Sequence, residues 1–125
     1  MIKQYFITIN PHHLELNEYV LKKDLKTSLL KYYRKTLGRY FNKKKDEQYE
    51  LYVFMEQGRS NQSHIHMIAM VDDIKINDFY ESLIMNMKKK YLTLTSDIKE
   101  IYEINNLLGY LTKEQCPIFS NKDLY

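Results

Sequence analysis

Two strand-like runs separated by a short polar segment constrain the fold of this chain more than any other feature. Residues 49–56 (Tyr-Glu-Leu-Tyr-Val-Phe-Met-Glu) and 64–71 (His-Ile-His-Met-Ile-Ala-Met-Val) are rich in the β-branched and aromatic side chains that strands favour. The segment between them contains glycine, serine and asparagine, which are typical of a connecting loop. The sequence therefore predicts a β-hairpin.

His64 and His66 are the most informative residues of this hairpin. Side chains alternate across a strand, so two residues at positions i and i+2 point to the same face. Glu56 ends the preceding strand eight residues before His64 and would face it across the hairpin. One carboxylate and two imidazoles form a ligand set that leaves coordination positions open for water or a substrate oxygen. The same pattern also fits two partly buried histidines without a ligand role, so the hairpin alone leaves both interpretations open.

Composition limits the class of protein. The chain has 125 residues, of which 44% are hydrophobic and 28% charged, as is usual for one soluble globular domain. A single cysteine, Cys116, excludes an intramolecular disulfide and a thiolate zinc cluster. No apolar run approaches the roughly 18 residues of a membrane span, and the N-terminus leads into a strand pattern instead of a signal peptide. We therefore expect a cytoplasmic protein without a membrane partner.

Strand and helix patterns alternate along the chain. The predicted elements are, in order, a strand (3–10), a helix (17–41), the two hairpin strands, a helix (77–89), a strand (92–95) and a helix (104–114). Asn17 and Asn77 are the expected N-caps of the first two helices. Residues 96–102 fit either a helix or a strand.

This order predicts an α+β protein with a ferredoxin/RRM-like antiparallel sheet (βαββαβ) and an added C-terminal helix. In such a fold the first two helices cover one face of the sheet and leave the other partly open. Burying a carboxylate and two histidines under the helices would be unfavourable unless they were paired, so we place them on the open face. Residues 1–116 are expected to form the domain, and residues 117–125, which show no periodicity, a C-terminal tail.

Three motifs in this order resemble those of the Rep-type HUH endonucleases, the single-tyrosine initiators of rolling-circle replication in viruses and plasmids. They are a first strand ending in Tyr-Phe-Ile-Thr-Ile-Asn-Pro, then His64-Ile65-His66 with the upstream Glu56, and finally Tyr110-Leu-Thr-Lys113 on the last predicted helix. The middle residue of the histidine motif is apolar, as the family pattern asks. The resemblance spans nearly the whole chain.

The resemblance implies a metal-dependent endonuclease and strand transferase that acts on single-stranded DNA at a replication origin. Tyr110 would attack the scissile phosphate and form a 5′-phosphotyrosine, and Lys113 would place a positive charge beside that phosphate. Glu56, His64 and His66 would hold a divalent cation, which in cells would be Mn²⁺ or Mg²⁺. The reverse of this step would rejoin the strands.

Basic and polar residues along the chain are the candidate DNA contacts. They are Asn10 and His12 after the first strand, Arg59 in the hairpin loop, and the run Lys43, Lys44 and Lys45. The chain has no Gly-x-x-x-x-Gly-Lys motif, so a helicase or polymerase would come from another protein in the host cell. A homodimer is compatible with this scheme, and Tyr102 is a weaker candidate for a second active tyrosine.

Two other functions fit parts of the pattern. Single-tyrosine transposases of the same superfamily typically carry a glutamine one turn after the tyrosine, where this chain has Glu114. Glu56 and Lys113 favour the initiator instead. A non-catalytic RRM-like nucleic-acid-binding module would use the sheet and not Tyr110, but the aromatic-rich strands of such modules are missing here.

Overall fold

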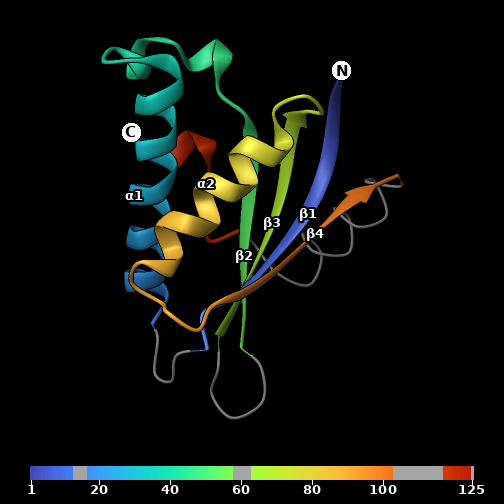
Figure 1. The fold of residues 1–125 in the computed structure, drawn as a ribbon. Coiled ribbons are helices and arrows are strands. Elements are labelled where there is room, and N and C mark those ends of the chain that lie inside the picture. Colours follow the sequence, from blue (N-terminus) through green and yellow to red (C-terminus); the bar gives the residue numbers. More distant parts are fainter. Residues whose placement is uncertain (13–16, 58–62, 103–116, 125) are drawn as a thin grey trace.

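Five antiparallel strands form one sheet, and two long helices pack on one of its faces (Figure 1). This computed structural model describes residues 1–12, 17–57, 63–102 and 117–124. The strands are β1 (Ile2–Asn10), β2 (Glu50–Gln57), β3 (Ser63–Asp72), β4 (Thr95–Ile101) and β5 (Phe119–Ser120), and the helices are α1 (Glu18–Leu37) and α2 (Ile76–Lys88). The strand order is β4-β1-β3-β2-β5. The protein is thus α+β, as expected, and the arrangement is compatible with a ferredoxin-like fold.

The register of β3 against its two neighbours fixes which side chains share a face of the sheet. Thr8 of β1 lies opposite His66, and Glu56 of β2 lies opposite His64. Directly paired residues point to the same face, and alternation sends the residues between them to the other. Thr8, Glu56, His64 and His66 therefore share one face.

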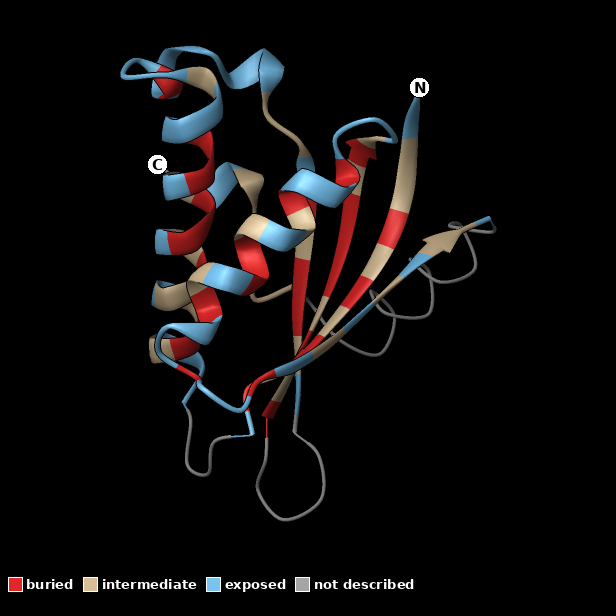
Figure 2. Cartoon of the chain, in the orientation of Figure 1, coloured by how far each residue is buried: buried red, intermediate tan, exposed pale blue. Residues whose placement is uncertain are grey.

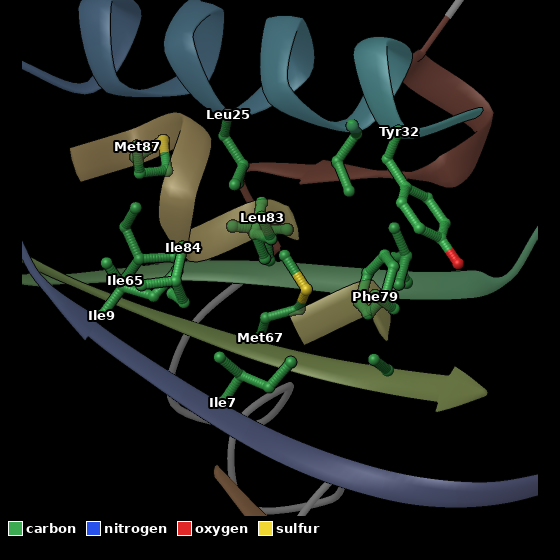
Figure 3. Close-up of a cluster of buried hydrophobic side chains, with 14 of the residues drawn as sticks. Ile7, Ile9, Leu25, Tyr32, Ile65, Met67, Phe79, Leu83, Ile84 and Met87 are labelled. Atoms are coloured by element: carbon green, nitrogen blue, oxygen red, sulfur yellow. The ribbon is translucent and has the colours of Figure 1, made fainter. Parts of the chain in front are cut away.

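The main hydrophobic core lies between the other face and the two helices (Figure 3). Its strand and helix residues are fully or nearly fully buried, among them Ile7, Ile9, Ile65 and Met67 from the sheet, Leu21, Leu25 and Leu29 from α1, and Phe79, Leu83 and Met87 from α2. Burial follows the inner surfaces of the two layers, while the outer surfaces of the helices are largely exposed (Figure 2). The histidines thus lie on the face opposite the helices, as predicted.

A smaller apolar cluster lies on the same face as the histidines. Phe54 and Ile68 have no exposed surface, and Phe6, Tyr52, Met70 and Ile101 pack against them. Phe54 lies directly opposite His66 in the register. The polar hairpin residues therefore border an apolar centre of the sheet.

The predicted helix boundaries are partly confirmed. Asn17 caps α1, because its side-chain oxygen accepts a hydrogen bond of 2.8 Å from the backbone N–H of Val20. Helix α1 ends at Leu37, before the predicted end, because Gly38 has a φ of 91° in the left-handed region that glycine adopts readily. Asn77 as a cap is wrong: α2 begins one residue earlier, and no side chain caps it.

The fourth strand was predicted too early in the chain. Residues 92–94 form a turn, in which Leu92 is exposed and Leu94 is buried, and β4 spans the later segment that fitted either structure. The alternation of leucine and threonine imitates a strand pattern there. The true strand lacks a clear hydrophobic pattern, because it lies at the edge of the sheet and carries polar residues such as Asp97 and Lys99.

Residues 117–124 add to the fold where the sequence predicts a tail. β5 pairs with β2, and the backbone N–H of Ile118 donates a 2.8 Å hydrogen bond to the carbonyl of Val53. Phe119 and Leu124 are buried in the main core. A two-residue strand has too few positions to show periodicity. The third predicted helix, 104–114, lies outside the described residues, and no helix within them is long and apolar enough to cross a bilayer.

The packing of β5 gives a first prediction. Phe119→Ala should lower the free energy of unfolding, measured by urea denaturation, by about 3–5 kcal/mol, because it removes a fully buried ring. Lys122→Ala, a nearby exposed position, should change it by less than about 0.5 kcal/mol. Equal, small effects of both substitutions would mean that the C-terminal residues do not belong to the core.

Candidate functional site

A direct contact between Glu56 and His66 forms the centre of the candidate site. The Nε2 atom of His66 lies 2.8 Å from Oε2 of Glu56, across the β2–β3 pair. An ionised carboxylate only accepts hydrogen bonds, so the imidazole is the donor. The Glu56 side chain is 57% exposed and His66 is 15% exposed. The contact therefore lies at the surface, where solvent and a ligand can reach it.

Two neighbours on β1 orient the ring of His66. Phe6 stacks against the imidazole with the ring centroids 5.4 Å apart and an interplanar angle of 7°. The hydroxyl oxygen of Thr8 lies 3.4 Å from the ring's Nδ1 atom. Both nitrogens of His66 thus have a polar neighbour, and its plane is fixed by packing. Metal-ligating histidines are usually held in this way through the nitrogen that does not bind the metal.

His64 lies next to this pair without completing a cluster. It is directly opposite Glu56 in the register and points to the same face. However, no three His, Cys, Asp or Glu side chains in the described parts of the chain are close enough together to hold a metal ion. Side chains directly opposite each other have Cβ atoms only about 4.5–5.5 Å apart, so His64 and Glu56 are neighbours on this face.

The chemistry of these donors fits a divalent cation. Carboxylate oxygens suit Mg²⁺ and Mn²⁺, and imidazole nitrogens suit the first-row transition metals. Two adjacent ligands of an octahedral ion, each about 2.1 Å from it, lie about 3 Å apart. The 2.8 Å separation of His66 Nε2 and Glu56 Oε2 is close to this value. A metal ion could therefore take the place of the hydrogen between His66 Nε2 and Glu56 Oε2 with little movement of either side chain.

The end of β1 places two further predicted residues at the same end of this face. Asn10 lies opposite Thr95 of β4, and its side chain accepts a 2.9 Å hydrogen bond from the backbone N–H of His12. The Nε2 atom of His12 lies 2.8 Å from the hydroxyl oxygen of Thr95. His12 has a φ of 53°, which is uncommon for a residue with a side chain. These two hydrogen bonds hold His12 in that conformation and fix its ring beside Asn10.

Three predicted residues are not brought to this place. Lys43, Lys44 and Lys45 lie in and between the short helices η1 (Phe41–Lys43) and η2 (Lys45–Glu47), ahead of the start of β2. Glu56 lies near the other end of that strand, and the seven residues from Glu50 to Glu56 span about 20 Å. Any DNA contact by these lysines would be remote from the Glu56–His66 pair. Arg59, Tyr110 and Lys113 lie outside the described residues.

The structure adds residues to the site that the motif search did not single out. Thr8 and Phe6 contact His66 directly, and the exposed Asp97 of β4 lies opposite Thr8. All three belong to the face of the histidines by strand alternation. The sequence does indicate the face of Thr8, because Thr8 precedes Asn10 by two residues in the same strand and the two therefore share a face. The pairing of Thr8 with His66 depends on the register, which no local pattern reveals.

Comparisons with known proteins give a fold and no function. No protein-family model matches the chain, and no curated protein matches it. Among solved structures, it is similar to one described as "De novo designed protein Foldit4", with a TM-score of 0.55 and 15% sequence identity. The match covers 81% of this chain and 97% of the designed protein. At this identity the likeness concerns the backbone arrangement only.

The Glu56–His66 pair gives a second prediction. Glu56→Gln keeps the size of the side chain but removes its charge, so Mn²⁺ binding measured by isothermal titration calorimetry should weaken by about tenfold or more. Glu50→Gln is the matched control, because Glu50 lies on the same face of the same strand at the far end of it. A wild-type affinity retained by Glu56→Gln would show that the carboxylate is not a ligand.

Proposed function

We propose that this protein is a metal-dependent endonuclease that nicks and joins single-stranded DNA through a tyrosine, and so initiates replication of a viral or plasmid genome. The observation that carries the proposal is the contact of Glu56 with His66, with His64 beside them on the face opposite the helices. We also assign the sheet to the βαββαβ ferredoxin/RRM-like topology, which the order β4-β1-β3-β2 of its four longer strands supports.

Glu56, His64 and His66 are the proposed ligands of Mn²⁺ or Mg²⁺. Such an ion, when bound, supplies a positive charge that neutralises a non-bridging oxygen of the scissile phosphate. Phe6 and Thr8 would hold the ring of His66 in position through the contacts described above. Asn10 and His12 would contact the DNA strand next to that phosphate, since their hydrogen bonds fix them at the same end of the face.

The nucleophile is assigned to Tyr110, and the surroundings of three described tyrosines make them poor alternatives. Burial raises the pKa of Tyr32 and of Tyr91, so their phenols are harder to deprotonate than usual. Tyr52 is on the face of the histidines, but its hydrogen bond to Glu50 and its burial raise its pKa as well. A tyrosine nucleophile needs the opposite change, because the phenolate is the attacking form.

The connectivity of the sheet sets a requirement on Tyr110. The described chain leaves the sheet at Ile101 in β4, which forms one edge, and returns at Phe119 in β5, which forms the other. Helices α1 and α2 occupy one face between these edges (Figure 1). The proposal requires the connecting residues to bring Tyr110 over the opposite face, where Glu56 and His66 lie.

The proposed reaction conserves the number of phosphoester bonds. The Tyr110 oxygen attacks phosphorus, the bond from phosphorus to the 3′-oxygen breaks, and that oxygen takes up a proton as it leaves as a 3′-hydroxyl. The phenol loses its proton, and Lys113 would stabilise the resulting negative charge beside the phosphate. Because the 5′-phosphotyrosine keeps the bond energy, a 3′-hydroxyl can reverse the step and join strands without ATP.

The apolar centre of the sheet favours this function over a non-catalytic RRM-like module. Such modules stack bases on exposed aromatic side chains in the middle of the sheet. Here Phe54 and Ile68, at the middle of that face, have no exposed surface. A base therefore has no access to these two side chains at the centre of the face.

The proposal predicts a covalent product. Purified protein with Mn²⁺ and end-labelled single-stranded oligonucleotides covering its own replicon should give a protein–DNA adduct on the 5′ end of the downstream fragment. The adduct should disappear in EDTA and in Tyr110→Phe, which lacks the attacking oxygen. Tyr102→Phe is the matched control and should retain it.

Two results would contradict the proposal in different ways. Binding without an adduct on every oligonucleotide of the replicon would indicate a binding module. An adduct that persists in Tyr110→Phe and is lost in Tyr102→Phe would assign the chemistry to a different tyrosine.

A further inference from the structure

A basic groove runs along the outer face of the first half of α1. It has a volume of about 460 Å³ and is lined by Tyr19, Lys22, Lys23, Lys26, Thr27 and Leu30, which we call the α1 groove. These positions follow helical spacing and lie beside the buried stripe of Leu21, Leu25 and Leu29. The groove is on the layer of helices and is separate from the face that carries Glu56 and His66.

The α1 groove is positive throughout the lining that the structure describes. Its described lining residues include three lysines and no carboxylate. The two acidic residues of α1 are Glu18, in its first turn, and Asp24, and neither lines the groove. Asp24 is engaged elsewhere: the Tyr91 hydroxyl donates to it, and the Nζ atom of Lys90 lies 2.9 Å from it. The lysines of the groove are therefore left to attract an anion from solution.

A second groove in the helical layer shows that this charge is not a general property of α1. It lies between α1 and α2, and its lining mixes Lys31 and Lys35 with Asp78 and Glu81. Opposite charges there offset each other. The α1 groove differs from this second groove in that its described charged lining residues are all lysines.

An exposed aromatic ring gives the α1 groove a second kind of contact. Tyr19 is 75% exposed, so its ring is available to stack against a flat ligand. At the inner side of the groove, the Nζ atom of Lys26 lies 5.7 Å from the ring centroid of Phe119, so that lysine is held against the β5 strand. Lysines beside an exposed aromatic ring suit a single-stranded nucleic acid, whose phosphates and bases both find partners.

The position of the groove connects it to the proposed site. Helix α1 begins at the end of the sheet where β1 ends at Asn10, β2 ends at Gln57 and β3 begins at Ser63 (Figure 1). The first turns of α1 therefore lie at the same end of the molecule as His12, His64 and Glu56, in the other layer. A DNA strand that continued from the proposed site around this end of the sheet would reach the layer that carries the α1 groove.

We infer that the α1 groove binds the DNA strand beyond the nucleotides at the proposed site, with Lys22 and Lys23 on phosphates and Tyr19 stacked on a base. The inference rests on the proposed function, since it names where the substrate of that site continues. It assigns most of the salt-dependent affinity to lysines that do not take part in the cleavage chemistry.

The test is the salt dependence of binding to a fluorescein-labelled oligothymidine of about 30 nucleotides, followed by anisotropy in EDTA so that no cleavage occurs. For single strands, the slope of log K against log salt is negative, and each lost phosphate contact reduces its magnitude by about 0.7. The double variant Lys22→Gln/Lys23→Gln should therefore reduce the magnitude of the slope by about 1.4. Tyr19→Ala should weaken binding by about tenfold with the slope unchanged.

The matched control is Lys31→Gln/Lys35→Gln, which removes the same charge from the same helix and should leave the slope as in the wild type. Equal losses in both double variants, or none in either, would overturn the inference while leaving the proposed function intact, provided that the wild type still forms its adduct with Tyr110. If the wild type binds no single strand at all, the proposed function fails together with the inference.

Discussion

The antiparallel pairing of β3 with both β1 and β2 is the constraint on which the rest of the structure depends. A shift of one residue in either register would send His64 and His66 to the face covered by the helices. It would also move Ile65 and Met67, which are fully buried in the core, to the opposite face. The hydrophobic pattern of β3 therefore fixes the position of the polar site as firmly as it fixes the core.

The two faces of β3 therefore have different surroundings. The inner residues are buried by α1 and α2, whereas His66 is held by Phe6 and Thr8 on the outer face and contacts a half-exposed carboxylate, Glu56. A buried carboxylate of this kind would cost far more to keep ionised. Placing the pair at the polar end of the sheet keeps it ordered and open to a ligand.

Sequence patterns predicted what local spacing encodes. The hairpin, the Asn17 cap and the face of the histidines follow from alternation and capping, and they are confirmed. β4 was predicted too early in the chain, because an edge strand exposes residues such as Asp97 and carries little hydrophobic pattern, and β5 was missed because two residues show no period. The contact of Thr8 with His66 depends on pairing across 58 residues of chain, which no local rule contains. The proposed ligand set itself remains a prediction.

The measurement that tests the central claim most directly is the NMR line broadening caused by substoichiometric Mn²⁺. The account predicts that the backbone signals of Thr8, Glu56 and His66 broaden first and that those of Asp72 and Asp73 do not. Those two aspartates pair with the N-terminal amine at the far end of the sheet and serve as the comparison, because a cation drawn to carboxylates in general would also affect them. Broadening centred on them, with Glu56 and His66 unaffected, would contradict the assignment of the metal to the histidine face.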